Sequence, residues 1–229
     1  MAVHYNDIDI NKTNMLLDLP MTEGIGTTLN DVATPSRLVT LVGAPTWTAL
    51  VSELITLNFN GTTQYGQCLN ADCADLGFTT GDYSILCVIN WTATPDSQII
   101  MGRYELNVGG WELYLFDDPN YYLTLRHHHA GGVATRSACN SSGWTQGTNW
   151  LLGISRVGSS AIMYRNGVAL TTTGVLEDPE ATTSDLTIGV RYTKNDNYFH
   201  NMLYRPRIIG AALTASQHET AYELIKEWL

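Results

Sequence analysis

Two short apolar runs, residues 111–116 and 122–128, carry the densest group of side chains that could bind a ligand. If the leucines of both runs face a core as strands, the opposite face displays aromatic, cationic and imidazole groups together. Aromatic rings beside a few polar groups line small-molecule sites, and exposed patches of this kind also mark protein contacts. The candidate ligand-binding residues are Tyr114, Phe116, Tyr122, Arg126 and His128.

The pairing of these two runs can be worked out from their alternation. Both leucine faces stay on the same side only if the intervening loop holds an odd number of residues, because a shift of one residue exchanges the faces. A loop over 117–121 meets this condition. It predicts three facing pairs: Phe116 with Tyr122, Tyr114 with Thr124, and Glu112 with Arg126. An aromatic pair and an opposite-charge pair are favourable neighbours across strands.

Three consecutive histidines, residues 127–129, end the second run. On a strand His127 and His129 share a face, which is a usable spacing for two metal ligands. A metal site would need further ligands, and the sequence assigns none. The alternative, which we favour, is a strand end that turns into Gly131-Gly132.

The elements that must position these groups are short strands. Apolar or alternating runs recur along the 229 residues between turn signals, as expected for a sandwich or barrel. The best hairpin signal is Asn166-Gly167, because both residues tolerate the positive φ of a type I′ turn. One helix is predicted over 214–229, with Thr214 or Ser216 as its N-cap. We expect an N-terminal arm (1–14) and one domain (15–229).

Six segments, in order, resemble the motifs of laminin-G-like jelly rolls, a branch of the concanavalin A-like superfamily. The resemblance covers roughly residues 15–225 and implies an all-β, two-sheet antiparallel jelly-roll sandwich with a short C-terminal helix. The segments are LNFNGTTQYGQC (57–68), FTTGDYSILCVINW (78–91), GGWELYLFDD with YYLTLRH (109–118 and 121–127), NWLLGISRVGSSAIMYRNGVAL (149–170), LTIGVRY (186–192) and LYRPRIIGAALTASQHETAY (203–222).

The resemblance also allows a test for glycoside hydrolysis. Enzymes on this fold carry a Glu-x-Asp-x-x-Glu strand, and two carboxyl groups must flank the scissile bond. Here Glu105 is followed by Asn107 in the Asp position and by Gly109-Gly110 near the second Glu position. Because the acids are missing, and because no Ser-His-Asp motif is found, we expect a protein that is not an enzyme.

Calcium is the one cofactor that the resemblance suggests. Laminin-G-like domains often bind it at a loop rim through one or two Asp side chains and backbone carbonyls, and calcium prefers oxygen ligands. The candidate calcium ligands are Asp117, Asp118 and Asp196. Their alternative role is turn formation, which Asp favours through its own backbone hydrogen bonds.

Charge and composition limit the partners. The net charge of −10 and the pI near 4.8 disfavour nucleic acid and anionic membrane surfaces. The N-terminus lacks the basic start and apolar core of a classical signal peptide.

Of the four cysteines, Cys68 and Cys73 flank a short loop and could form a disulfide or remain thiols.

These observations lead to a functional expectation. We expect a non-catalytic structural or binding module of a surface assembly, such as a virion decoration, spike or fibre protein. Its partner would be another protein or further copies of the chain, on a virion or extracellular surface. A lectin-like carbohydrate-binding module with a glycan partner is the alternative, and a glycoside hydrolase is the third reading.

Overall fold

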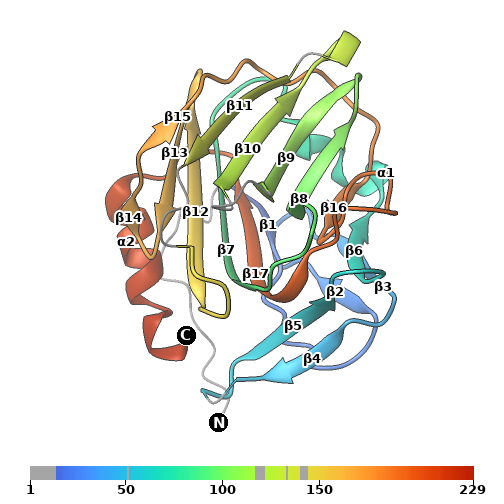
Figure 1. Ribbon diagram of the computed structural model, residues 1–229, viewed down its shortest axis with the longest axis vertical. Coiled ribbons are helices and arrows are strands. Elements are labelled where there is room, and N and C mark those ends of the chain that lie inside the picture. The colour runs from blue at the N-terminus through green and yellow to red at the C-terminus, as the bar shows by residue number, and fades with distance from the viewer. Residues whose placement is uncertain (1–13, 51, 117–121, 133, 140–143) are drawn as a thin grey trace.

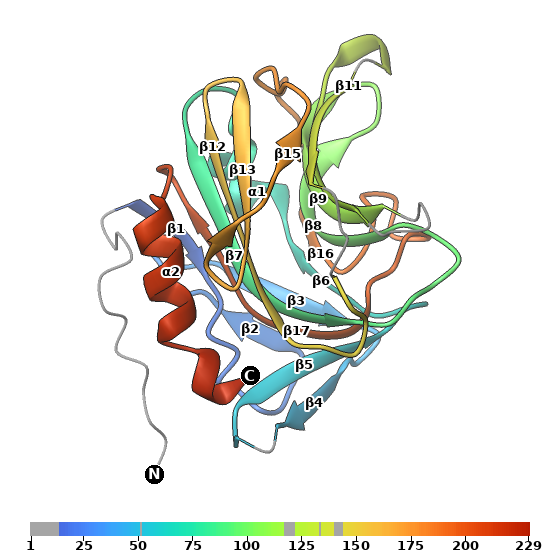
Figure 2. The same ribbon diagram turned by 60° about the vertical axis from the view of Figure 1, so that its left-hand side comes forward.

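The computed structural model describes residues 14–229 except 51, 117–121, 133 and 140–143. Two antiparallel sheets face each other, as Figure 1 and Figure 2 show. The jelly-roll sandwich that the resemblance implied is therefore confirmed. The predicted N-terminal arm, residue 14 apart, lies outside the described residues.

The first sheet, sheet A, has the order β14-β13-β12-β7-β17-β5-β4, and β1 also pairs with β17. Its strands are β1 (Met15–Asp18), β4 (Thr46–Ala49), β5 (Ile55–Asn60), β7 (Tyr83–Trp91), β12 (Trp150–Val157), β13 (Ser160–Arg165), β14 (Val168–Ala169) and β17 (His200–Ile209).

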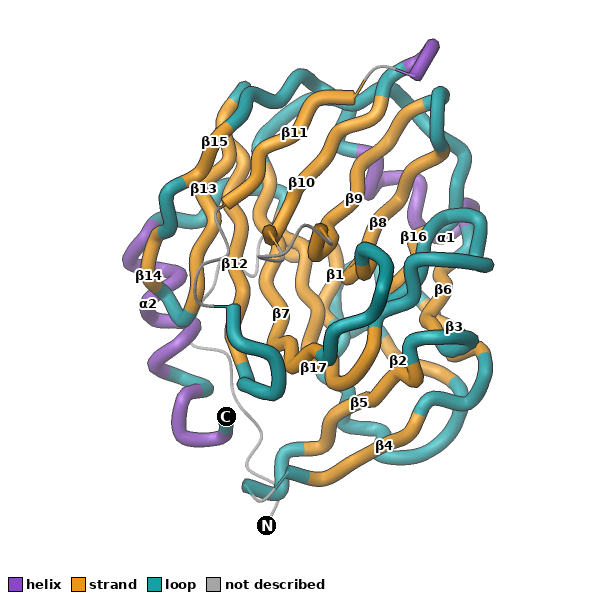
Figure 3. Tube along the Cα trace, in the orientation of Figure 1, coloured by secondary structure: helices purple, strands orange, loops and turns teal. Residues whose placement is uncertain are grey.

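The second sheet, sheet B, has the order β15-β11-β10-β9-β8-β16-β6-β3-β2, which can be followed in Figure 3. Its strands are β2 (Thr28–Asn30), β3 (Leu38–Val42), β6 (Tyr65–Cys68), β8 (Gln98–Glu105), β9 (Gly109–Phe116), β10 (Tyr122–His128), β11 (Ala134–Cys139), β15 (Thr172–Thr173) and β16 (Leu186–Ile188).

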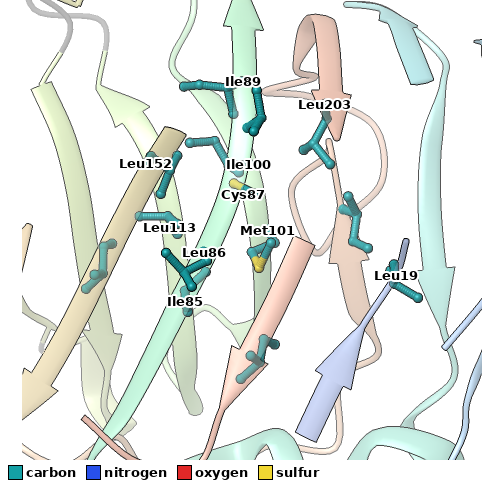
Figure 4. Packing of buried hydrophobic residues seen from close by; sticks show 14 of the residues in the cluster. Leu19, Ile85, Leu86, Cys87, Ile89, Ile100, Met101, Leu113, Leu152 and Leu203 are labelled. Atoms are coloured by element: carbon teal, nitrogen blue, oxygen red, sulfur yellow. The ribbon is translucent and has the colours of Figure 1, made fainter. Parts of the chain in front are cut away.

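The core lies between the sheets. Figure 4 shows side chains of β7 and β12 meeting those of β8 and β9, among them Ile85, Leu152, Met101 and Leu113, all of which are buried. Strand β7 carries a nearly continuous apolar run because it is covered on both faces. One face points into the sandwich, and the C-terminal segment covers the other.

That segment forms α2 (Ala215–Glu223), which Figure 2 shows outside sheet A. Thr214 is its N-cap, and Gln217 completes a capping box by bonding back to the Thr214 backbone. The predicted helix over 214–229 is shorter in the structure: α2 ends at Glu223, and a 3₁₀ turn follows at Lys226–Trp228. Two other 3₁₀ turns, Ala74–Gly77 and Ala130–Gly132, and the one-turn helix α1 (Asn70–Cys73) lie at loop positions.

The predicted Asn166-Gly167 hairpin is confirmed. Tyr164 pairs with Ala169 and Arg165 with Val168, so the loop has two residues. Both turn residues have positive φ, 50° and 78°, as a type I′ turn requires.

Cys68 and Cys73 do not form the disulfide that the sequence left open. Cys68, Cys73 and Cys87 are buried free thiols.

No helix among the described residues is long and apolar enough to cross a membrane.

Candidate functional site

The hairpin of β9 and β10 has the register that the sequence predicts. Phe116 faces Tyr122, Tyr114 faces Thr124, and Glu112 faces Arg126. Leu113 and Leu115 point into the core with Leu123 and Leu125, and all four are fully buried. The candidate residues therefore share the outer face of sheet B.

A cavity of about 190 Å³ opens on this face. Four of the five candidate residues line it: Tyr114, Phe116, Arg126 and His128. Tyr122 is opposite Phe116 in the register but is not part of the lining. Glu112 of β9 also lines it, and the remaining lining residues come from the β8 side and from the loop before β17: Ser97, Ile99, Tyr104, Leu106, Arg191 and Asn197.

Glu112 organises the floor of the cavity. Its side chain is 3% exposed, and a carboxylate this buried needs compensating charge. Nη1 of Arg126 donates to Oε1 at 2.9 Å, and Nε2 of His128 donates to the same oxygen at 2.9 Å. Gly102 faces Glu112 from β8, and a Cβ built there would lie 3.0 Å from the Glu112 Cβ. The cross-strand charge pair is thus part of a wider buried network.

Aromatic rings form the walls around this floor. Tyr104 stacks on His128 with ring centroids 4.5 Å apart and planes 13° apart. Burial raises the pKa of Tyr104, and the neighbouring charge of Glu112 raises it further, so the hydroxyl stays protonated. The guanidinium of Arg126 lies 4.8 Å from the Tyr114 ring centroid and donates to the Tyr114 hydroxyl. Phe116 meets Tyr114 edge-on at 6.3 Å.

The groups differ in how far solvent reaches them. Tyr104, Glu112, Tyr114 and His128 are buried, whereas Phe116 is half-buried. The side chains of Arg126 and Arg191 are 27% and 30% exposed. The buried residues therefore hold the cavity in shape, and the half-buried ones can touch a ligand.

The three candidate calcium ligands are placed less completely. Asp117 and Asp118 lie outside the described residues. One oxygen of Asp196 accepts from Arg191 Nη1 at 2.8 Å and the other from Thr193 Oγ1 at 2.8 Å. Calcium binding at these residues stays a prediction, since no group of three or more metal-ligating side chains occurs among the described residues.

The histidine run ends β10, as favoured from sequence. Nδ1 of His127 donates to the Glu177 carbonyl at 2.6 Å, and Nε2 accepts from the Tyr83 hydroxyl at 2.7 Å. Both ring nitrogens are therefore occupied by protein groups. His129 lies 3.5 Å from the Thr135 hydroxyl.

The lining gives no support to glycoside hydrolysis. Its described residues include one carboxylate, Glu112, and this is bound to Arg126 and His128, whereas the reaction needs two carboxyl groups across the bond. Glu105 ends β8, and residues 106–108 form the turn to β9. The segment in which the sequence lacked the acid motif is thus the end of β8 and a hairpin turn.

One serine–histidine pair was not foreseen. Oγ of Ser155 and Nε2 of His218 are 2.8 Å apart, a distance that would suit a nucleophile and its base. Ser155 and His218 are only 2% and 1% exposed. Ser155 also donates to the Leu213 carbonyl, so the pair fixes the C-terminal segment to sheet A.

Sequence reasoning missed Tyr104, Arg191 and Asn197. Tyr104 follows the apolar run 98–102, and a bulge between Ile99 and Met101 changes which residues of β8 face outward. Arg191 and Asn197 lie in a loop with no periodic pattern. One further lining residue, Glu112, could be placed from the sequence, because its predicted pairing with Arg126 puts its carboxylate on the candidate face.

The jelly roll thus carries on one outer face a cavity with aromatic walls, and its described lining holds one carboxylate. The sequence model of the concanavalin A-like lectin/glucanases superfamily matches residues 60–217. The chain belongs to this superfamily.

Solved structures of similar fold include binding domains of botulinum neurotoxins and of Paraclostridial Mosquitocidal Protein 1. The botulinum neurotoxin serotype G binding domain aligns with a TM-score of 0.73 and 13% identity, over 92% of this chain and 51% of that one. The binding domain of Paraclostridial Mosquitocidal Protein 1 aligns at 0.70 and 14%, over 92% and 52%. The botulinum serotype D ligand-binding domain, in complex with N-acetylneuraminic acid, aligns at 0.71 and 11%, over 93% and 51%.

The chain therefore spans about half the length of these domains. At such identities the likeness shows a shared fold. A comparison with curated proteins finds no match to this sequence.

Proposed function

We propose that the protein is a carbohydrate-binding module that holds one sugar unit in the cavity of sheet B. The observation that carries this proposal is the joint lining by aromatic rings and polar groups from β8, β9 and β10. Two toxin domains of the same fold also support it, because they are described with N-acetylneuraminic acid and with ganglioside molecules.

The size and chemistry of the cavity define the ligand class. Its volume of about 190 Å³ is below the roughly 300–1,000 Å³ of sites for drug-sized molecules. Arg126, Arg191 and Asn197 offer donors for sugar hydroxyls, and Phe116 offers an apolar surface. Glu112 is already paired with Arg126 and accepts from His128, so a sugar unit need not supply a charge to the site.

A glycan array followed by calorimetry tests the proposal. Binding of at least one glycan is expected, with Phe116→Ala and Arg126→Gln each weakening it about tenfold, a change of about 1.4 kcal/mol. Arg165→Gln is the matched control, since Arg165 is a half-buried arginine on β13 of the other sheet. Absence of any glycan binding, with and without calcium, would remove the proposal, as would equal weakening by the control.

A role in a surface assembly is the second candidate, and we propose a virion or extracellular setting for it. Apolar side chains are exposed near the β2 edge of sheet B: Ile25 at 80%, Leu38 at 54% and Leu69 at 56%. The register that pairs Thr40 with Gln67 brings Leu38 next to Leu69. A stable interface would bury more than about 1,000 Å².

Sedimentation decides between assembly and a lone module. The assembly role predicts oligomers at micromolar concentration that Leu38→Lys dissociates. A wild-type chain that stays monomeric across that range, without a partner, argues against it.

A further inference from the structure

A second and larger cavity, of about 630 Å³, lies at one end of the sandwich. The segment between α1 and β7 forms one wall, and residues 181–182, before β16, form another. Its lining includes Gly77, Thr79, Thr80, Arg103 and Thr182. It shares no residue with the cavity of the proposed function, so an inference from it is independent of that proposal.

Among the described residues of this lining, Arg103 is the only arginine. It comes from β8 and is 2% exposed. Nη2 donates to Asn70 Oδ1 at 2.5 Å and to the Thr182 carbonyl at 2.8 Å. A Cβ built on Gly77 would lie 3.4 Å from Nη1. The head of Arg103 therefore lies between two segments that line the cavity.

The hydrogen bonds of Arg103 are incomplete. Its Nε is buried and has no hydrogen-bond partner among the described residues. The two oxygen atoms that accept from Nη2, an amide and a carbonyl oxygen, are both neutral. A buried charge without a counter-charge is costly, and a buried donor without an acceptor adds to that cost.

Other buried arginines of the chain pair with carboxylates, which supply the counter-charge. Arg37 pairs with Asp31 and Asp75, and Arg156 pairs with Asp178. For Arg103 the described residues supply no carboxylate. Cys73 is an acidic group that does interact with Arg103: its pKa is lowered to about 7, first by a hydrogen bond with Cys68 and further by the charge of Arg103 and a hydrogen bond with it.

The two acids that line the cavity are occupied elsewhere. Asp75 accepts from Nη2 of Arg37, and Asp82 accepts from the Gly158 amide at 2.9 Å. Thr79 and Thr80 are exposed at the rim. Their hydroxyl groups can donate to a ligand that reaches the guanidinium.

We propose that this cavity binds a small oxyanion, a carboxylate, sulfate or phosphate group, through the guanidinium of Arg103. The anion takes the place of the carboxylates that pair with the other buried arginines. A guanidinium is suited to this role because its planar N–H groups match the oxygens of such anions. The group could belong to a free ion or to a larger acidic molecule. The separate titrations below distinguish a carboxylate from a sulfate and from a phosphate group.

Nitrogen-15 NMR of the full chain provides the test. Sodium acetate, sodium sulfate and sodium phosphate are titrated separately at constant ionic strength. A pH of about 6 keeps the Cys73 thiol protonated. The Arg103 Nε–H signal and the Gly77 and Gly81 amides are expected to shift and saturate with at least one anion. No saturable shift with any of the three overturns the proposal.

Two matched variants show whether the site is this cavity. Thr80→Glu places a like charge at the exposed rim and is expected to raise the dissociation constant about fivefold. Thr62→Glu makes the same change in net charge at an exposed position in the β5–β6 turn, outside the lining, and should leave it within twofold. Equal weakening by both variants means non-specific attraction and also overturns the proposal. Neither position is buried, so both variants are expected to fold.

Discussion

Acidification should destabilise the fold through two buried histidines. Burial lowers the pKa of His127 to about 4 and that of His218 to about 3. In the unfolded chain both would titrate near ~6.5. Between these values the unfolded state binds more protons than the folded state, so stability falls as the pH falls.

The size of the effect follows from the shifts. A pH of 5 is about 1.5 units below the pKa of an unfolded histidine, so protonation there stabilises the unfolded state by roughly 2 kcal/mol. Both folded histidines remain almost neutral at that pH, so together they cost about 4 kcal/mol relative to pH 7.5. This is a large part of the ~5–15 kcal/mol that stabilises a typical domain.

The surroundings of each ring explain why protonation is opposed. For His127 burial is the largest cause of the lowered pKa, and the charge of Arg156 adds to it, while the hydrogen bond to the Glu177 carbonyl and the charge of Asp178 act the other way. His218 stacks on Tyr164 at 3.7 Å. For His218 burial is the sole cause of the lowered pKa.

Urea unfolding at pH 7.5 and pH 5.0 measures the effect. The wild type is compared with His127→Gln and His218→Gln, which cannot take up a proton. Each variant should lose about 2 kcal/mol less than the wild type between the two pH values. Because each protein is compared with itself, the cost of the substitution cancels. The same pH-dependent loss in all three proteins would refute the reasoning.

Three further predictions concern how the C-terminal segment is held, each checked by urea unfolding at pH 7.5. Gly153→Ala puts a Cβ 2.4 Å from His218 Nδ1 and should cost about 3 kcal/mol. His218→Ala should relieve part of this cost, and additive losses would contradict the clash. Thr214→Ala removes the N-cap and should cost about 1 kcal/mol; no change would mean that the capping box is not stabilising. Gly167→Ala forces a side chain into a φ of 78°, with its Cβ 2.8 Å from the Glu219 backbone, and should cost about 2 kcal/mol; a loss below about 0.5 kcal/mol would contradict the strain.

Much of sheet A and the centre of sheet B follows from alternation. The leucines of β9 and β10 fix which face is inward, and the loop length then fixes the register, so Glu112 and Arg126 could be paired without a structure. The Asn166-Gly167 turn was readable for a similar reason, because it combines a dihedral requirement with flanking strands. In both places a local rule and the burial pattern point to the same arrangement.

Other strands of sheet B gave no such signal. Strands β2 and β15 have three and two residues, too few to show a period, and β6 carries Gly66 and Gln67 among its four residues. The loop that brings Arg191 and Asn197 to the cavity depends on tertiary contacts, such as the bond from Ile99 N to the Asn197 carbonyl. Arg103 was also missed, because its lack of a counter-charge is a property of its neighbours in space.

Burial, more than residue type, decides which groups of this protein can act on a ligand. On sheet A the pair of Ser155 and His218 has the geometry of a nucleophile and base, yet α2 covers it and the imidazole resists protonation. On sheet B the ion pair of Glu112 and Arg126, with His128 bonded to Glu112, lines a cavity. The C-terminal helix covers the outer face of sheet A, so the groups on that face stabilise the fold. The cavity lies on the outer face of sheet B. On sheet B Phe116 and Arg126 are half-buried, so these are the side chains that the proposed sugar unit would contact.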